Sequence, residues 1–192
     1  MRVGILGPLE VRDGERSVVV AGARLRALLI RLALDPGRPV SLSALSEALW
    51  GDAPPADTAN AVQTLVSRLR RAVPGLGVRS GPAGYRLDLD PDDVDAGCFE
   101  RLARQGREAL RDGNAREALT TLRDALALWR GPALAEVTDA PYAATAAARL
   151  AELRLTAQED RIEAELRTGR PELLVAELDE LTAAHPLRER LA

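Results

Sequence analysis

The chain contains no lysine, and this absence excludes several kinds of chemistry. All 26 basic residues among its 192 are arginines. A Schiff base with a carbonyl substrate, a P-loop phosphate site and a kinase-type active site each depend on a lysine amine. These enzyme classes are therefore excluded before any motif is considered.

Cysteine and histidine are almost as scarce. Cys98 is the single cysteine, and His185 is the single histidine. No disulfide can form within the chain, and no zinc site can be assembled from cysteine and histidine ligands. A catalytic triad would have to use His185, which precedes Pro186 near the end of the sequence. We therefore predict a protein that is not an enzyme and that uses no metal or cofactor.

Long apolar runs are also missing. No run approaches the roughly 18 residues of a membrane-spanning helix, and the first residues resemble a strand rather than a secretion signal. Hydrophobic residues make up 46% of the chain and charged residues 29%, which is enough for a buried core. The sequence predicts a folded, cytoplasmic protein.

Charge and composition change near residue 90. Residues 1–90 carry 12 arginines and 9 acidic residues, whereas residues 91–192 carry 14 arginines and 20 acidic residues. The first part mixes short β-branched runs with helical patterns, and the second is rich in strong helix formers. An acidic segment with a proline, residues 88–95, lies between them. We place a domain boundary there, giving domains 1–90 and 91–192.

The first domain is predicted to hold a small antiparallel sheet and three helices. Residues 3–6, 9–12 and 17–20 have strand character, with an Asp13-Gly14 turn before the last. Leucine spacing predicts helices over residues 23–35 and up to Trp50, the second capped by Ser41 or Ser43. A third helix should begin at Asp57 or Thr58 and end near residue 73.

The third helix carries the clearest functional pattern. Its apolar side consists of Val62, Leu65, Val66, Leu69 and Val73. Its opposite side is free of acidic residues and consists of Asn60, Gln63, Thr64, Ser67 and Arg71, flanked by Arg68 and Arg70. Amides, hydroxyls and guanidinium groups read base edges and bind phosphates in a major groove. The alternative is an ordinary amphipathic surface helix.

A basic hairpin follows directly. Residues 78–80 and 85–87 are predicted strands joined by a Gly81-Pro82-Ala83-Gly84 turn, which places Arg79 and Arg86 on one ribbon. Three helices followed by such a hairpin is the order of a winged helix. Gly84 would let Tyr85 point inward, or it is a plain turn glycine. The candidate DNA-binding residues are Thr58, Asn60, Gln63, Thr64, Ser67, Arg68, Arg70, Arg71, Arg79, Tyr85 and Arg86.

The residues of this region resemble a known family. The runs Leu49-Trp50-Gly51-Asp52, Pro54-Pro55, Asn60 to Arg71 and Gly84-Tyr85-Arg86-Leu87, with the opening residues 4–11, resemble the OmpR-type winged helix of the Streptomyces antibiotic regulatory proteins. Phe99 and residues 126–131 resemble the bacterial transcriptional activation domain of that family. One position departs from the family: on the apolar side of the third helix, this sequence has Leu65 where the family commonly has an aromatic residue.

The resemblance implies a sequence-specific DNA-binding activator of secondary-metabolite genes. Such proteins bind direct repeats in promoter DNA as head-to-tail dimers and contact RNA polymerase. The resemblance also implies that the loop holding Asp52, Pro54 and Pro55 faces the polymerase. Two alternatives remain open at this stage. The protein could be a DNA-binding repressor, or a helical adaptor that binds protein and no DNA.

The second domain is predicted to be all helical. Helices are expected over residues 94–112, 115–129, 142–168 and 172–184, paired as in tetratricopeptide repeats or packed as a plain bundle. Its net negative charge repels DNA, so we assign it to protein contact or dimerisation. Residues 187–192 resemble the first turn of another helix, and the domain is expected to continue beyond them. The predicted fold class is mainly α with small β.

Overall fold

The computed structural model describes residues 1–169, 174–185 and 188, and it divides the chain into two compact units. The first unit contains Met1–Cys98 and Trp129–Leu150, and the second contains Phe99–Leu128 and the described residues from Ala151 onward. These units differ from the two domains predicted with a boundary at residue 90, because residues 129–150 return to the first unit. Each unit is described separately below.

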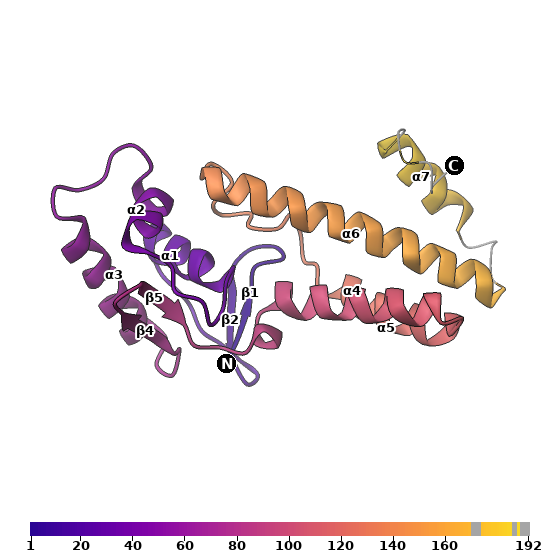
Figure 1. Cartoon of the computed structure of the whole chain (residues 1–192), viewed down its shortest axis with the longest axis horizontal. Helices are drawn as coiled ribbons and strands as arrows, with labels where there is room; N and C mark the ends of the chain where they lie inside the picture. The colour runs from indigo at the N-terminus through magenta and orange to yellow at the C-terminus, as the bar shows by residue number, and fades with distance from the viewer. Residues whose placement is uncertain (170–173, 186–187, 189–192) are drawn as a thin grey trace. The chain divides into compact units, whose positions relative to one another are not determined.

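The first unit begins with a three-stranded antiparallel sheet (Figure 1). Its strands are β1 (Arg2–Gly4), β2 (Glu10–Asp13) and β3 (Arg16–Ser17), in that order. The predicted hairpin at Asp13-Gly14 is present, with Asp13 opposite Arg16. The third strand is shorter than predicted: Val18 still donates to the Val11 carbonyl, but Val19 is 78% exposed and lies outside the sheet.

Three helices pack against one another in this unit: α1 (Ala23–Ala33), α2 (Leu42–Trp50) and α3 (Thr58–Ala72). Their leucine stripes form the core, and Leu28, Leu29, Leu45 and Leu69 are fully buried. Ser41 caps α2, since its hydroxyl accepts from the Ala44 N–H, and Asp57 caps α3 by accepting from the Asn60 N–H at 3.0 Å. Both caps are among the residues predicted from the sequence.

The predicted hairpin forms a second sheet of β4 (Val78–Gly81) and β5 (Gly84–Leu87). Val78 and Leu87 are paired and face the core. The next pair, Arg79 and Arg86, lies opposite each other on the outer face. The hairpin also pairs with Val40, whose N–H and carbonyl bond to the backbone of Tyr85. Gly84 has a φ of +120°, and a Cβ there would lie 2.0 Å from the Val40 oxygen. The position therefore requires glycine for both conformation and close approach.

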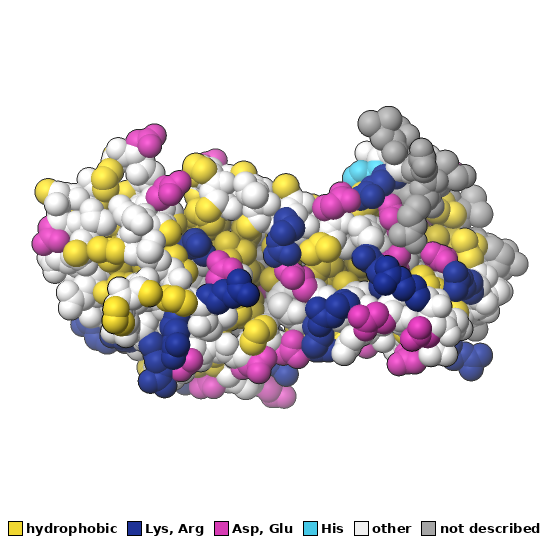
Figure 2. Space-filling model, viewed as in Figure 1, with side chains coloured by type: hydrophobic (Ala, Val, Ile, Leu, Met, Phe, Trp, Pro, Cys, Tyr) yellow, Lys and Arg dark blue, Asp and Glu magenta, His cyan; other side chains and the backbone are white. Residues whose placement is uncertain are grey.

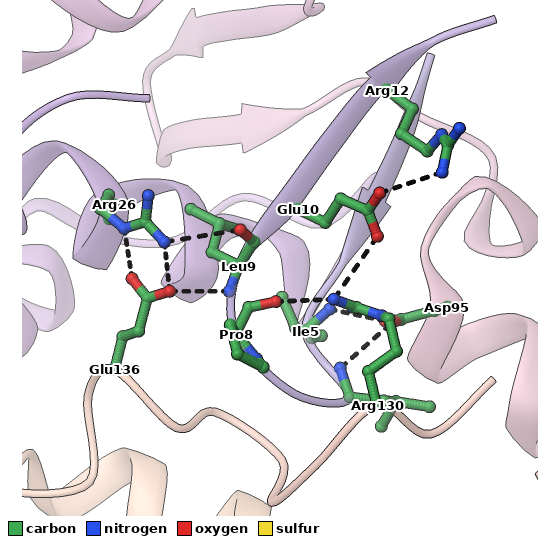
Figure 3. Close-up of polar contacts among 10 residues, drawn as sticks. Ile5, Pro8, Leu9, Glu10, Arg12, Arg26, Asp95, Arg130 and Glu136 are labelled. Atoms are coloured by element: carbon green, nitrogen blue, oxygen red, sulfur yellow. Dashed lines mark hydrogen bonds and ion pairs between the residues drawn. The ribbon is translucent and has the colours of Figure 1, made fainter. Parts of the chain in front are cut away.

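Residues 129–137 complete the N-terminal sheet region of the same unit (Figure 3). The Arg130 N–H donates to the Leu6 carbonyl at 2.8 Å, and its guanidinium donates to Asp95 at 2.9 Å. Asp95, the first residue of α4 (Asp95–Arg111), accepts from the backbone N–H groups of Ile5 and Leu6. Glu136 accepts from the Leu9 N–H and from the Arg26 guanidinium. These contacts were not predicted.

The second unit is built from most of α4, α5 (Ala115–Ala127), the later part of α6 (Pro141–Thr168) and α7 (Val175–Ala184). Gly106 lets α4 approach α5 closely, since a Cβ there would lie 2.5 Å from the Leu122 side chain. Leu155 and Ile162 of α6 form a second apolar cluster that also contains Leu174. Over these helices, arginine and acidic side chains lie interspersed on the face shown in Figure 2.

The predicted fold class, mainly α with small β and a winged helix before a helical domain, is confirmed. Helix α5 ends two residues before the predicted end at Trp129. Residues 172–173 of the predicted last helix lie outside the described residues, and so does the expected further helical turn apart from Arg188. Among the residues that the structure describes, no helix combines the length and apolar character needed to cross a bilayer.

Candidate nucleic-acid interface

Helix α3 presents a polar face that is open to solvent. Its apolar side is buried, with Val62 and Leu69 inaccessible. Its other side exposes seven of the predicted DNA-binding residues: Asn60, Gln63, Thr64, Ser67, Arg68, Arg70 and Arg71. No acidic residue interrupts this face, so the donors and acceptors that can read base edges are unobstructed.

The arginines of α3 differ in what they contact. Within the described part of the chain, Arg68 and Arg71 make no hydrogen bond or ion pair, so their guanidinium groups are available to an anion. The Nε of Arg70 instead donates to the Val78 carbonyl at 3.0 Å. Arg70 thereby joins the last turn of α3 to strand β4. The polar face and the basic hairpin are held side by side.

The two hairpin arginines share a carboxylate. Asp88 accepts from the Arg79 Nε at 2.5 Å, and its other oxygen lies 3.8 Å from an Arg86 nitrogen. The hydrogen bond from Arg79 is the main cause that lowers the pKa of Asp88, with the charges of both arginines adding to it. The exposed face of the hairpin therefore carries two cations and one firmly ionised anion.

Two other predicted residues have local structural contacts. The Thr58 hydroxyl donates to the Pro55 carbonyl at 3.0 Å, which fixes the loop before α3. Tyr85 is half-buried, in keeping with the inward direction expected after Gly84. Both residues support the surface from its edge, while the exposed residues of α3 form its centre.

The loop between α2 and α3 borders an open groove. Asp52 and Pro54 are exposed, and Pro55 is half-buried. The groove, about 700 Å³ in volume, is lined by Trp50, Pro55, Thr64 and Arg68 among others. The concave surface beside α3 thus continues from the predicted DNA-reading face to the predicted polymerase-facing loop.

Sequence reasoning missed the role of Asp88. From the sequence alone, Asp88 is only the first residue of the acidic segment 88–95. Its position two residues after Arg86 on a strand was the available signal, because alternate strand residues lie on one face. The hydrogen bond from the Asp88 N–H to the Gly77 carbonyl extends the hairpin by one more pair and keeps that alternation.

Comparison with known families gives two matches in chain order. Residues 16–80 match the family described as "Transcriptional regulatory protein, C terminal". Residues 94–192 match the "Bacterial transcriptional activator domain". The first match covers the three helices and the start of the hairpin, and the second covers the helices from α4 onward.

Several characterised proteins are similar over the whole chain. The regulatory protein DnrI of Streptomyces peucetius is 39% identical over 202 residues, covering 100% of this chain and 74% of DnrI. The transcriptional regulator RedD of Streptomyces coelicolor is 39% identical, with 99% and 56% of the two chains covered. The solved structure of Mycobacterium tuberculosis EmbR in complex with a low-affinity phosphopeptide has a TM-score of 0.93 at 34% identity. The chain spans 52% of that EmbR chain.

Proposed function

Because the chain belongs to the Streptomyces antibiotic regulatory protein family of transcriptional regulators, we propose that it activates transcription by binding promoter DNA and contacting RNA polymerase. In this proposal residues 1–90 form the DNA-binding domain and residues 91–192 the activation domain. The protein acts as a regulator and not as an enzyme. Its place of action is the cytoplasm, where bacterial promoter DNA lies.

The observation that carries this proposal is the exposed, acid-free face of α3 beside a basic hairpin. With α3 in the major groove, Asn60, Gln63, Thr64 and Ser67 present the groups that discriminate bases. The arginines of α3 and of the hairpin bind phosphates on either side: Arg68, Arg70, Arg71, Arg79 and Arg86. Thr58 and Tyr85 line the edge of the same interface.

The family points to finer features of the proposed function. Two copies would bind head to tail on direct repeats, and the loop with Asp52, Pro54 and Pro55 would face the polymerase. The names of DnrI and RedD describe regulators from Streptomyces, which supports secondary-metabolite genes, antibiotic genes among them, as the targets. The acidic helical region is suited to protein contact because its charge disfavours DNA.

Selection of DNA from a randomised duplex library tests the binding step. We expect the protein to enrich a repeated motif, and footprinting of the enriched duplex to show two protected half-sites. The logarithm of affinity should fall linearly with the logarithm of salt concentration, and each phosphate contact should add about −0.9 to the slope. Failure to enrich or protect any duplex at low salt would overturn the proposal.

Transcription in vitro then tests activation. A template carrying the enriched motif upstream of a weak promoter should give more transcript with the protein and purified polymerase than with polymerase alone. A decrease in transcript would identify a repressor and contradict the activation step, while leaving the DNA-binding step intact.

A further inference from the structure

The outer face of the hairpin carries three charged side chains in an alternating cross-strand arrangement. Arg79 and Arg86 are directly opposite each other in the β4–β5 register. Like charges at opposed positions repel one another. Asp88 follows Arg86 on the same face and contacts both guanidinium groups, so it relieves this repulsion in the free protein.

All three groups are accessible to a macromolecular ligand. Side-chain exposure is 67% for Arg79, 47% for Arg86 and 38% for Asp88. The Asp88 carboxylate accepts a hydrogen bond from the Arg79 guanidinium at 2.5 Å. A DNA phosphate uses the same charge-assisted hydrogen bonds to arginine as a carboxylate does. The two anions therefore compete for one donor.

We propose that Asp88 limits the affinity of the hairpin for DNA by acting as an internal competitor of the phosphate backbone. This inference rests on the proposed DNA binding and adds a residue that tunes it. In the free protein Asp88 holds Arg79 and Arg86 together. On DNA, each hairpin–phosphate contact requires an arginine to leave Asp88, and the freed carboxylate then lies close to the negatively charged backbone.

Arg68 and Arg71 of α3 provide the contrast. Neither is engaged by an acidic side chain in the described part of the chain, so their phosphate contacts have no internal competitor. The structure thus separates arginines that are free to bind at once from arginines that must first exchange partners. The contribution of the hairpin should be smaller than its charge suggests.

The variant Asp88→Asn tests the inference, with the enriched duplex as the probe and fluorescence anisotropy as the measurement. Asparagine keeps the shape and the backbone hydrogen bond but removes the charge. Since exposed ion pairs contribute little, we expect binding to tighten roughly two- to fivefold. The slope of log affinity against log salt concentration should also become more negative by up to about 0.9, which is the contribution of one phosphate contact. Thermal unfolding by circular dichroism verifies that the variant folds.

A matched charge control and a double-mutant cycle separate competition from general electrostatics. Asp93→Asn removes the same charge five residues further along, at a residue whose side chain contacts neither hairpin arginine among the described contacts. We expect it to change affinity less than Asp88→Asn does. In an Arg79→Ala/Arg86→Ala background, the gain from Asp88→Asn should fall to the level of this control.

The outcomes distinguish this inference from the proposed function. If wild-type protein binds no duplex, the proposed function fails. If it binds and Asp88→Asn weakens binding, Asp88 orients the arginines and the inference is overturned. An equal gain in the wild-type and double-alanine backgrounds also overturns it, because the effect would then not pass through Arg79 and Arg86.

Discussion

At the scale of single residues, Arg68 and Arg71 should contribute most to DNA affinity among the arginines. Both are exposed on α3 and unpaired among the described residues, so no internal contact is lost when a phosphate binds. We expect Arg68→Ala or Arg71→Ala to weaken binding by about 1–3 kcal/mol each. Anisotropy titrations with the enriched duplex measure the loss.

Arg104→Ala is the matched control for these variants. Arg104 is also exposed, but it lies on α4 in the second unit. Its removal should leave affinity within error of wild type. An equal loss for Arg104 and Arg68 would mean that net charge, and not the α3 surface, determines binding.

Gly84 is the residue at which a single methyl group should be most harmful to the first unit. Its φ of +120° disfavours other residues, and a Cβ would lie 2.0 Å from the Val40 oxygen. We expect Gly84→Ala to lower the free energy of unfolding by about 2–4 kcal/mol. Urea unfolding measures this. Gly14→Ala is the matched comparison. Gly14 also has a positive φ, but a Cβ added there would have no atom within 4 Å.

At the scale of elements, the sequence predicts helices and turns well, because residues close together in the chain determine them. The 3.6-residue periodicity and Asp57 identified α3 and its cap, and the Gly81–Gly84 turn identified the hairpin. The predicted strand at residues 17–20 extends beyond the observed β3, because three consecutive valines suggest a strand whether or not a partner strand continues beside them. In the antiparallel register these valines run back towards the start of β2 at Glu10, and Val18 is the last of them with a described backbone bond to that strand.

The second unit contains buried acidic residues whose partners lie on other helices. Asp160 of α6 is 3% exposed and accepts from the Arg107 Nε of α4 at 2.7 Å. Removing one partner of a buried pair leaves an uncompensated charge. We therefore expect Arg107→Ala to destabilise the protein by about 3 kcal/mol. Chemical denaturation followed by circular dichroism measures the change.

Replacement of both partners should be much less harmful. In Arg107→Met/Asp160→Met neither charge of this pair remains, so the double variant should recover much of the stability lost in Arg107→Ala. A double variant less stable than the single one would show that other contacts of Asp160 dominate.

At the scale of the whole molecule, sequence reasoning failed to foresee that residues 129–150 belong to the first unit. The connection depends on backbone bonds, Arg130 to Leu6 and Leu134 to Ile5, which leave no residue signature. Arg130 and Glu136 look like ordinary surface charges among many others in a helical, arginine-rich region. Leu134 even adopts a φ of +56°, which no pattern of apolar residues predicts.

The pair of Glu136 and Arg26 makes this connection sensitive to acid. The hydrogen bond from Arg26 is the main cause that lowers the pKa of Glu136 from its usual 4.5, opposed by partial burial. A lowered folded-state pKa contributes stability above pH 4.5, and that contribution is lost as pH falls through the folded-state value. We expect Glu136→Gln to have a lower melting temperature than wild type at pH 7, and the difference between the two proteins to shrink as pH falls below 4.5.

Asp139→Asn provides the control for this titration. Asp139 lies exposed in the same loop, and it forms no ion pair among the described residues. Its variant should follow the wild-type melting curve at both pH values. A constant difference between Glu136→Gln and wild type across the range would contradict an ionic role for Glu136.

The return of residues 129–150 to the first unit makes residues 99–128 an excursion from it. A peptide bond cut at the exposed Gly113-Asn114 turn would sever the backbone but leave the contacts of Arg130 and Glu136 with the N-terminal strands in place. The nicked protein should therefore elute as one particle and separate only in denaturant. By the same reasoning, two fragments produced separately, 1–113 and 114–192, should reconstitute the protein when mixed, which offers a split reporter for folding inside cells.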